Sequence, residues 1–335
     1  MRAISVFDTA RGRELGMTTE GIKHNTDLLG GQNNFGYKHN EYYGTYVNSE
    51  GESVLLRERE NKYSKPQITL KDFWQVNDKF YISNVAYVSI GNGGGTGISN
   101  ISSQSKKDGR LDAQIIYNNN TFGDFGPPIN TDYHPTELYA SKYKYLGTNN
   151  HFWMGLLSTA TYVKSENLSI SGGIDLRSYQ GEHYREVYDL VGGDYTLDID
   201  PNGVNNYNDE SPVKKVGDKI FYHDLGKVNW GGVFGQAEYK KDLWSVFVSA
   251  SGSVSAYNGV DYFRKRTLDI DGETLEIGYD DVVTHKGINY DRNSAGLKTY
   301  ETGWKTIPGY TIKTGANYLI NEFSNVFVNL GYLNN

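Results

Sequence analysis

The chain has 335 residues, with 33 basic and 40 acidic side chains, which gives a formal net charge of −7 at pH 7 with histidine neutral. This sign disfavours a non-specific nucleic-acid binder, which would carry basic clusters. The absence of cysteine excludes disulfide frameworks, thiolate zinc sites and cysteine nucleophiles. With 28 tyrosines, 39 glycines and 14% aromatic residues, the composition indicates a folded chain that is rich in β structure.

Segments that could act as membrane helices or as export signals are not visible. The longest clean apolar stretches, such as Met154 to Leu157, are far shorter than the ~20 residues that a membrane-spanning helix needs. The first residues, MRAISVFDTARGRELG, contain no apolar region of a signal peptide.

The strongest pattern is an alternation with a period of two residues, which is typical of strands with one apolar and one polar face. Leu168, Ile170, Ile174 and Leu176 alternate with polar residues or glycine. The same pattern recurs in the segments 243–256, 310–320 and 325–332. A helix would spread these apolar residues around its whole circumference, so the pattern predicts strands.

The strands are predicted to form four hairpins with short polar turns. The pairs are 62–76 with 79–91, 151–164 with 168–180, 229–240 with 243–257, and 309–320 with 324–333. The connections between hairpins are much longer, at 92–150, 181–228 and 258–308. Short turns at one end and long loops at the other are typical of an outer-membrane barrel.

The aromatic residues near the strand ends support the same interpretation. Near the short turns lie Phe73, Trp74, Phe80, Tyr81, Tyr162, Tyr239, Trp244, Tyr318 and Phe323; toward the long loops lie Trp153, Trp230, Tyr257, Tyr310 and Tyr332. Two such girdles flank the apolar band of an outer-membrane barrel. The opposite face is expected to be polar and to carry Gln67, Lys71, Asp175, Arg177, Gln236, Glu238, Lys313, Asn317 and Asn329.

These patterns predict an all-β fold, a partial antiparallel transmembrane β-barrel of about eight strands in four hairpins, with short periplasmic turns and long extracellular loops. Residues 1–61 are expected to be a long extracellular loop segment, and residues 62–335 the partial barrel. The chain begins in a long polar segment and ends directly after a strand. We therefore expect a fragment that lacks strands on both sides.

Four stretches, in this order, carry a resemblance to a known family. They are NKYSKPQITLKDFWQVNDKFYISNVAYVSIGNGGGTG (61–97), GGIDLRSYQGEHYREVYDLVGGDY (172–195), VNWGGVFGQAEYKKDLWSVFVSASG (228–252) and GYTIKTGANYLINEFSNVFVNLGYLNN (309–335). Together they resemble the middle of a TonB-dependent outer-membrane receptor, of the branch with a carboxypeptidase-like regulatory domain. Residues 7–34 look like the family's preceding surface loop.

The resemblance implies a location in the outer membrane of a Gram-negative bacterium and uptake of a scarce nutrient (an iron chelate, a glycan or a peptide). Such receptors use a 22-stranded barrel around a plug, and a TonB box draws energy from an inner-membrane complex. The implied partners are outer-membrane lipid, the TonB complex through an N-terminal part that this chain lacks, a small extracellular ligand and a surface lipoprotein, but not nucleic acid. No enzymatic activity and no cofactor are expected.

Two candidate sites lie in the predicted long loops. The first is a group of aromatic and charged residues that suits recognition of a sugar, a peptide or a metal chelate: His183, Tyr184, Arg185, Tyr188 and Tyr195. The alternative to ligand binding is that these residues pack one loop against another. Oxygen ligands with calcium-loop spacing are offered by Asp198, Asp200, Asn202 and Asp209, with Gly203 at the turn position. The last ligand is Asp instead of Glu and neither flank resembles a helix, so a solvated loop is the alternative.

Other constellations point to no chemistry. The glycine-rich run 91–97 lacks the lysine and helix of a phosphate loop, and the seven histidines lack metal-ligand spacing. The acid pairs Asp280 with Asp281 and Glu182 with Glu186 would serve glycoside hydrolysis only if they met across a cleft. Two alternatives to the receptor remain open: a passive porin-like channel and a soluble β-rich carbohydrate-binding or hydrolytic domain.

Overall fold

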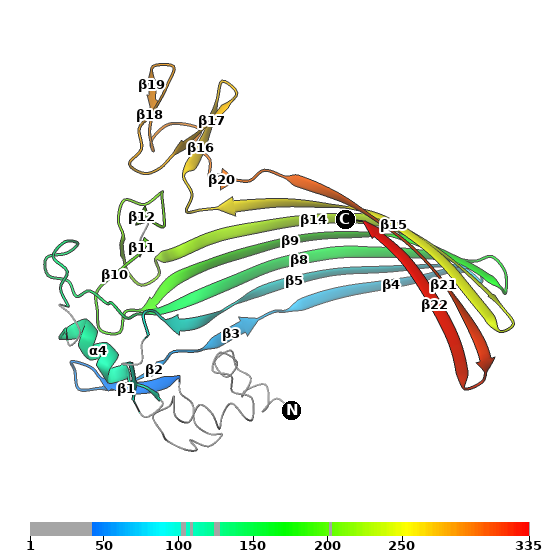
Figure 1. Cartoon of the computed structure of the whole chain (residues 1–335), viewed down its shortest axis with the longest axis horizontal. Coiled ribbons are helices and arrows are strands. Elements are labelled where there is room, and N and C mark those ends of the chain that lie inside the picture. Colours follow the sequence, from blue (N-terminus) through cyan, green and yellow to red (C-terminus); the bar gives the residue numbers. More distant parts are fainter. Residues whose placement is uncertain (1–41, 102–104, 108–109, 124–127, 201–202, 335) are drawn as a thin grey trace.

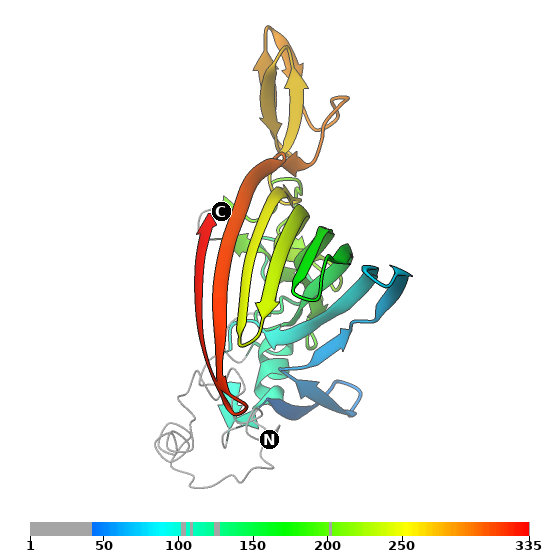
Figure 2. The same ribbon diagram turned by 90° about the vertical axis from the view of Figure 1, so that its right-hand side faces the viewer.

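The computed structural model describes residues 42–101, 105–107, 110–123, 128–200 and 203–334. Its main feature is one antiparallel sheet whose eight long strands follow one another in chain order (Figure 1). They are β4 (Gln67–Asn77), β5 (Phe80–Ile98), β8 (Lys144–Val163), β9 (Leu168–Asp189), β14 (Lys219–Lys241), β15 (Trp244–Asp261), β21 (Lys305–Asn321) and β22 (Ser324–Asn334). Figure 2 shows that the sheet curves like part of a cylinder wall.

The four predicted hairpins are confirmed, with β4–β5, β8–β9, β14–β15 and β21–β22 as the pairs. Two short strands lengthen the sheet at the end away from the turns: β3 (Asn61–Ser64) pairs with β5, and β20 (Tyr300–Glu301) pairs with β15. The eight strands and four hairpins thus agree with the predicted all-β class.

The strands run farther into the predicted long loops than the sequence indicated, so the connections are the shorter segments 99–143, 190–218 and 262–304. The glycine-rich run 91–97, most of which the sequence placed in the connection 92–150, belongs to β5 and pairs with β8. Beyond the apolar band neither face of a strand is apolar, so apolar and polar residues no longer alternate along it. For this reason the period-two pattern stops before the backbone pairing does.

The connections contain small elements of their own. The first holds β6 (Lys106–Lys107), β7 (Arg110–Leu111) and the helix α4 (Ala113–Thr121); the second holds β10 (Thr196–Leu197), β11 (Ile199–Asp200), β12 (Gly203–Val204) and β13 (Val213–Lys214). The third holds β16 (Arg266–Ile270), β17 (Glu273–Ile277), β18 (Val283–His285) and β19 (Ile288–Tyr290), two hairpins that stand away from the sheet (Figure 1). Among the described residues, no helix is long and apolar enough to cross a bilayer.

The segment predicted as a loop over residues 1–61 is only partly visible. Residues 1–41 lie outside the described residues, including the stretch 7–34 that the resemblance covered. The described remainder forms β1 (Tyr43–Val47), which pairs with β2 (Ser53–Arg57), and the first residue of β3.

The strand register separates an apolar face of the sheet from a polar face. Direct cross-strand partners share a face, and Ala237, Val248 and Thr314 are such partners on the apolar one. Large apolar side chains on this face are widely exposed: Val248 by 55%, Ile312 by 52% and Leu330 by 68%. The polar face carries all nine polar residues predicted for it: Gln236, Ser249 and Lys313 lie side by side, and the strand register places the others on the same face.

The register divides the predicted aromatic girdles between the two faces. On the apolar face near the short turns lie Trp74, Phe80, Tyr162, Tyr239, Trp244 and Tyr318, and toward the long loops lie Tyr310 and Tyr332. The prediction was wrong for Phe73, Tyr81, Trp153, Trp230 and Tyr257, which lie on the polar face. Position along a strand does not by itself fix the face of a side chain, because a shift by one residue moves it to the other face.

The buried hydrophobic residues gather at the long-loop end of the sheet. One cluster joins the β1–β2 hairpin to α4 through Tyr46, Leu56, Ile116 and Tyr117, and the rings of Tyr46 and Tyr117 stack at 4.8 Å. The fully buried Asn120 of α4 donates from Nδ2 to the carbonyl oxygens of residues 142, 190 and 191 at 2.7, 3.0 and 3.2 Å. These bonds join the connections 99–143 and 190–218, which together with the β1–β2 hairpin we call the folded cap.

Aromatic rings on the polar face lie against glycines. A Cβ atom added to Gly155 would lie 2.5 Å from the ring of Tyr87, and one added to Gly173 would lie 2.6 Å from the ring of Phe234. The missing side chains let these rings lie against the wall of the sheet, which buries ring area and fills the gaps.

We predict that Gly155→Ala lowers the free energy of unfolding by about 1–3 kcal/mol, because the new methyl group displaces the Tyr87 ring. The matched control is Gly252→Ala, also within a strand, where an added Cβ meets no atom within 4 Å. The midpoint of thermal unfolding in detergent, followed by circular dichroism, measures both. Equal midpoints for the two variants would contradict a stabilising contact between ring and glycine.

Candidate functional site

Five aromatic side chains on the polar face form what we call the polar-face aromatic cluster: Tyr87, Trp153, Tyr179, Trp230 and Tyr257. The register places them in two neighbouring rows across β5, β8, β9, β14 and β15. Trp153 pairs with Tyr179, and the row of Tyr87 continues through Gly155 and Arg177 to Trp230. Strands far apart in the sequence thus bring these rings together.

Three rings of this cluster, those of Tyr87, Trp153 and Tyr179, meet at steep angles. The Trp153 ring lies 6.0 Å from Tyr87 at an interplanar angle of 81°, and 6.4 Å from Tyr179 at 86°. Edge-to-face pairs of this kind are a favoured arrangement of aromatic rings. Trp153 remains 38% exposed and Tyr257 44% exposed, so aromatic surface is accessible here.

An ion pair lies in the same part of the polar face. Arg177 donates from Nε and Nη2 to the two carboxylate oxygens of Asp175, at 3.0 and 2.5 Å. The Arg177 guanidinium also lies over the Trp230 ring, 5.0 Å from its centroid. The two opposite charges cancel, so the pair adds hydrogen-bonding groups to the cluster without adding net charge.

Two histidines continue the cluster toward the long loops. His151 Nδ1 lies 2.6 Å from the Tyr179 hydroxyl, and the two rings stack at 5.7 Å. His183 packs edge-on against His151 at 5.3 Å, and its Nδ1 lies 2.5 Å from Asn149 Oδ1.

The predicted ligand residues do not form one cluster. His183, Tyr184, Arg185 and Tyr188 belong to β9, so the expectation that they lie on a long loop is wrong. Because neighbouring residues of a strand point to opposite faces, Tyr184 faces away from His183 and Arg185. Tyr195 is in a connection and fully buried, with its ring 5.7 Å from Tyr139 and its hydroxyl donating to the carbonyl of residue 130 at 3.3 Å. For Tyr195 the structure shows packing between loops, which was the alternative interpretation.

Arg185 lies among three aromatic rings. Its guanidinium is 4.2 Å from the centroid of Tyr145, 4.8 Å from Phe221 and 5.8 Å from Tyr222. Phe221 sits at an irregularity of β14 with a positive φ of 66°. These contacts stabilise β9 and β14 at their long-loop ends, so the role of Arg185 is structural.

The predicted calcium ligands are described only in part. Asn202 lies outside the described residues, as does the side chain of Asp200. The Asp198 carboxylate accepts from Asn205 Nδ2 at 2.7 Å and from the Phe221 N–H at 3.2 Å, while burial raises its pKa. Asp209 is ion-paired with Lys214. In the described part of the chain no three His, Cys, Asp or Glu side chains form a group that could hold a metal ion.

Three of the four acids considered for hydrolysis contact basic side chains. Glu182 lies 2.8 Å from His223, Glu186 lies 2.6 Å from Lys219 and Asp281 lies 2.6 Å from Lys265. The contacts of Glu186 and Asp281 are ion pairs, and the contact of Glu182 is a hydrogen bond with the His223 ring.

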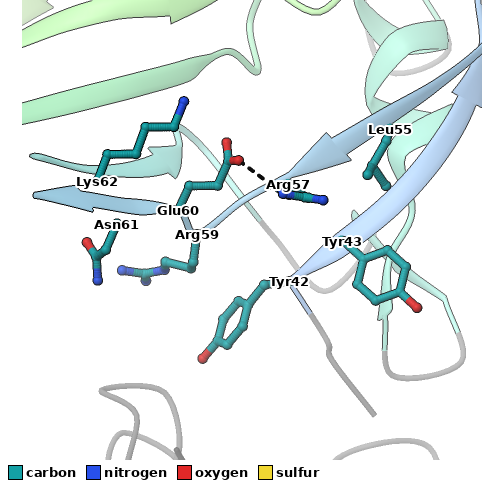
Figure 3. Close-up of a pocket in the computed structure, with 8 residues that line it drawn as sticks. All are labelled: Tyr42, Tyr43, Leu55, Arg57, Arg59, Glu60, Asn61 and Lys62. Carbon is teal, nitrogen blue, oxygen red and sulfur yellow. Dashed lines mark ion pairs between the residues drawn. The ribbon is translucent and has the colours of Figure 1, made fainter. Parts of the chain in front are cut away.

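A pocket of about 550 Å³ at the loop end is lined by Tyr42, Tyr43, Leu55, Arg57, Arg59, Glu60, Asn61 and Lys62 (Figure 3). Its two arginines have acidic partners: Arg57 lies 3.5 Å from Glu60, and Arg59 lies 3.4 Å from Glu58. Glu60 is also paired with the buried Lys144 of β8. An anionic ligand would have to displace these pairs, so the polar-face aromatic cluster is the better candidate site.

Three members of the polar-face aromatic cluster, Trp153, Trp230 and Tyr257, were predicted as girdle residues, and Tyr87 and Tyr179 were not predicted as site residues. On β14, Trp230 lies an even number of residues from Gln236 and Glu238, and on β15, Tyr257 lies an even number of residues from Ser249. Counting from these polar residues within each strand places both aromatic residues on the polar face.

No protein-family model matches this sequence, and no curated protein matches it. Among solved structures, the chain is similar to the open form of the ferric-catecholate import receptor Fiu from E. coli K12, with 12% identity and a TM-score of 0.41 over 81% of this chain and 35% of that one. It is also similar to the copper transporter OprC, with 9% identity and a TM-score of 0.43 over 83% of this chain and 32% of that one. The chain therefore spans about a third of the length of each.

We predict that Glu60→Gln destabilises the loop end of β8 at pH 7 by about 1–3 kcal/mol, because the buried Lys144 ammonium loses its carboxylate. The hydrogen bond from Lys144 lowers the pKa of Glu60 below its ordinary value of 4.5. The stabilisation is therefore complete above pH 4.5 and is lost as the pH falls through the lowered pKa.

Thermal unfolding of the wild type and Glu60→Gln at pH 7 and pH 3 measures this effect. The difference between them should shrink at pH 3. The double variant Glu60→Gln, Lys144→Met should recover part of the loss at pH 7. A difference that is independent of pH would refute the role of the ion pair.

Proposed function

We propose that this chain forms part of the wall of an outer-membrane β-barrel of a Gram-negative bacterium that takes up a scarce nutrient with energy delivered through TonB. The observation that carries the proposal is the separation of the faces. One face of the sheet is apolar and exposed, and the other is polar. The apolar face is bordered by Trp244 and Tyr318 near the short turns and by Tyr310 and Tyr332 toward the long loops. This is the arrangement that a barrel wall needs between lipid and an aqueous interior.

The dimensions of the apolar face also support a membrane location. From Tyr310 to Tyr318 a strand extends roughly 26 Å at ~3.3 Å per residue. With the usual strand tilt, this spacing matches an apolar band of about 20–25 Å. The folded cap lies at the opposite end from the short turns, in accord with extracellular loops on one side and periplasmic turns on the other.

In this proposal the partners are outer-membrane lipid on the apolar face, a small extracellular ligand on the loop side, and the TonB complex through a part of the protein outside these residues. A surface lipoprotein over the loops belongs to the same proposal. Transport would proceed by binding and gating, without bond chemistry. The passive channel is the second candidate, since a polar inner face serves it equally well.

A test of the TonB-dependent role uses the full-length protein from its outer membrane. We expect it to bind the purified periplasmic domain of TonB, measured by surface plasmon resonance. The same protein treated with a protease that removes its N-terminal segment is the control and should lose binding. Absence of binding by the intact protein would favour the passive channel.

We predict that Val248→Arg impairs insertion into the outer membrane. Val248 pairs with Thr314, which is halfway between Tyr310 and Tyr318, so it lies near the middle of the apolar band. An arginine facing lipid near the midplane costs about 2–4 kcal/mol. The amount of protein in purified outer membranes, quantified by immunoblot, should fall.

The matched control is Ser249→Arg, one residue away on the polar face beside Gln236 and Lys313. Its level in the outer membrane should equal that of the wild type. If both variants reach the outer membrane equally well, the assignment of the apolar face to lipid is wrong.

A further inference from the structure

The polar-face aromatic cluster is not explained by the wall of the barrel alone. A polar inner face needs hydrophilic side chains, and much of the rest of β15 on this face is serine: Ser245, Ser249, Ser251, Ser253 and Ser255. Across β5, β8, β9 and β14 the same face instead presents partly exposed rings of Tyr87, Trp153, Tyr179 and Trp230. Aromatic surface that stays exposed in a group is typical of a binding site.

The ring geometry suits a flat ligand with C–H groups on its faces. Tyr87 packs against Gly155, and Trp153 is nearly perpendicular to both Tyr87 and Tyr179. Each perpendicular pair forms a corner in which one ring can cover a face of the ligand while the other contacts its edge. The negative face of an aromatic ring attracts the slightly positive C–H groups of a sugar ring.

The charges of the site favour a neutral ligand. Arg177 is held by both oxygens of Asp175, so the pair presents no net charge to an incoming molecule. Arginine has five N–H donors, and its bonds to Asp175 engage two of its nitrogens. Asp175 adds acceptor lone pairs, and Tyr87, Tyr179 and Tyr257 contribute hydroxyl groups. Donors and acceptors of this kind match the hydroxyl groups of a saccharide.

We propose that the polar-face aromatic cluster, with Asp175 and Arg177, binds a neutral saccharide. Trp153 is the central stacking residue, and Arg177 and Asp175 hydrogen-bond the sugar hydroxyls. This inference rests on the proposed uptake function, for which it names the substrate class. An anionic chelate is disfavoured, because the guanidinium it would need is already neutralised.

The test measures binding of neutral hexasaccharides to the protein purified from outer membranes in detergent. Maltohexaose, xylohexaose, mannohexaose and galactohexaose serve as probes, and isothermal titration calorimetry together with tryptophan fluorescence reports binding. We expect at least one probe to bind and to change the fluorescence. Trp153→Ala should weaken that binding by about tenfold or more.

The matched control is Phe152→Ala, since Phe152 and Trp153 are adjacent on β8, are both 38% exposed and lie on opposite faces. Phe152→Ala should leave saccharide affinity unchanged, and Arg177→Met should lower it. All three single variants must reach the outer membrane at the wild-type level, which keeps this test separate from the proposed membrane function.

Three outcomes would overturn the proposal: no binding by any of the four probes, equal affinity for wild type and Trp153→Ala, or tighter binding of a ferric catecholate that depends on Trp153. The last result would reassign the cluster to an anionic chelate. Failure to find the wild-type protein in the outer membrane would instead overturn the proposed function, whatever the saccharide measurements show.

Discussion

The structure depends on one constraint, the alternation of side chains along strands that stay in register across the sheet. Each backbone pairing transmits the facing of one strand to the next, so Ala237, Val248 and Thr314 must share a face once their strands pair. A shift of one residue in β9, for example, would carry Asp175 and Arg177 into the apolar face. The separation of the faces is therefore a property of the whole sheet, and no single contact creates it.

The same constraint explains how one sheet presents two chemically different faces. On the polar face, Gly155 and Gly173 leave room for the rings of Tyr87 and Phe234 to lie against the sheet. These bulky side chains therefore pack along the sheet and do not project from it. The ion pair of Asp175 and Arg177 stays on this face, where water can reach it. On the other face most of the large exposed side chains are aliphatic or aromatic, such as Val248, Ile312 and Leu330, which suits hydrocarbon and an interface.

The sequence was sufficient for the strands, the hairpins and the polar face, because period-two patterns are local and strong in segments such as 168–179 and 243–256. It was not sufficient where the pattern weakens. His183 to Tyr188 were assigned to a loop, yet backbone pairing continues there without an apolar stripe. Trp153, Trp230 and Tyr257 were assigned by their height along the strand, and only the register shows that they face the polar side. Contacts such as Lys144 with Glu60 join residues 84 positions apart, which no local pattern reveals.

The location of the buried core also bears on the choice between a membrane barrel and a soluble domain. A soluble sheet covers its apolar face with a second layer, since exposed apolar area is unfavourable in water. Here the buried clusters around Tyr46 and Ile220 lie at the loop end, while Leu330 and Val326 on the apolar face are 68% and 55% exposed in the described residues. Neither cluster extends over the middle of the sheet. An apolar face of this length, bordered by tryptophan and tyrosine, matches a lipid layer as its covering medium, and this is why the membrane assignment is preferred to the soluble one.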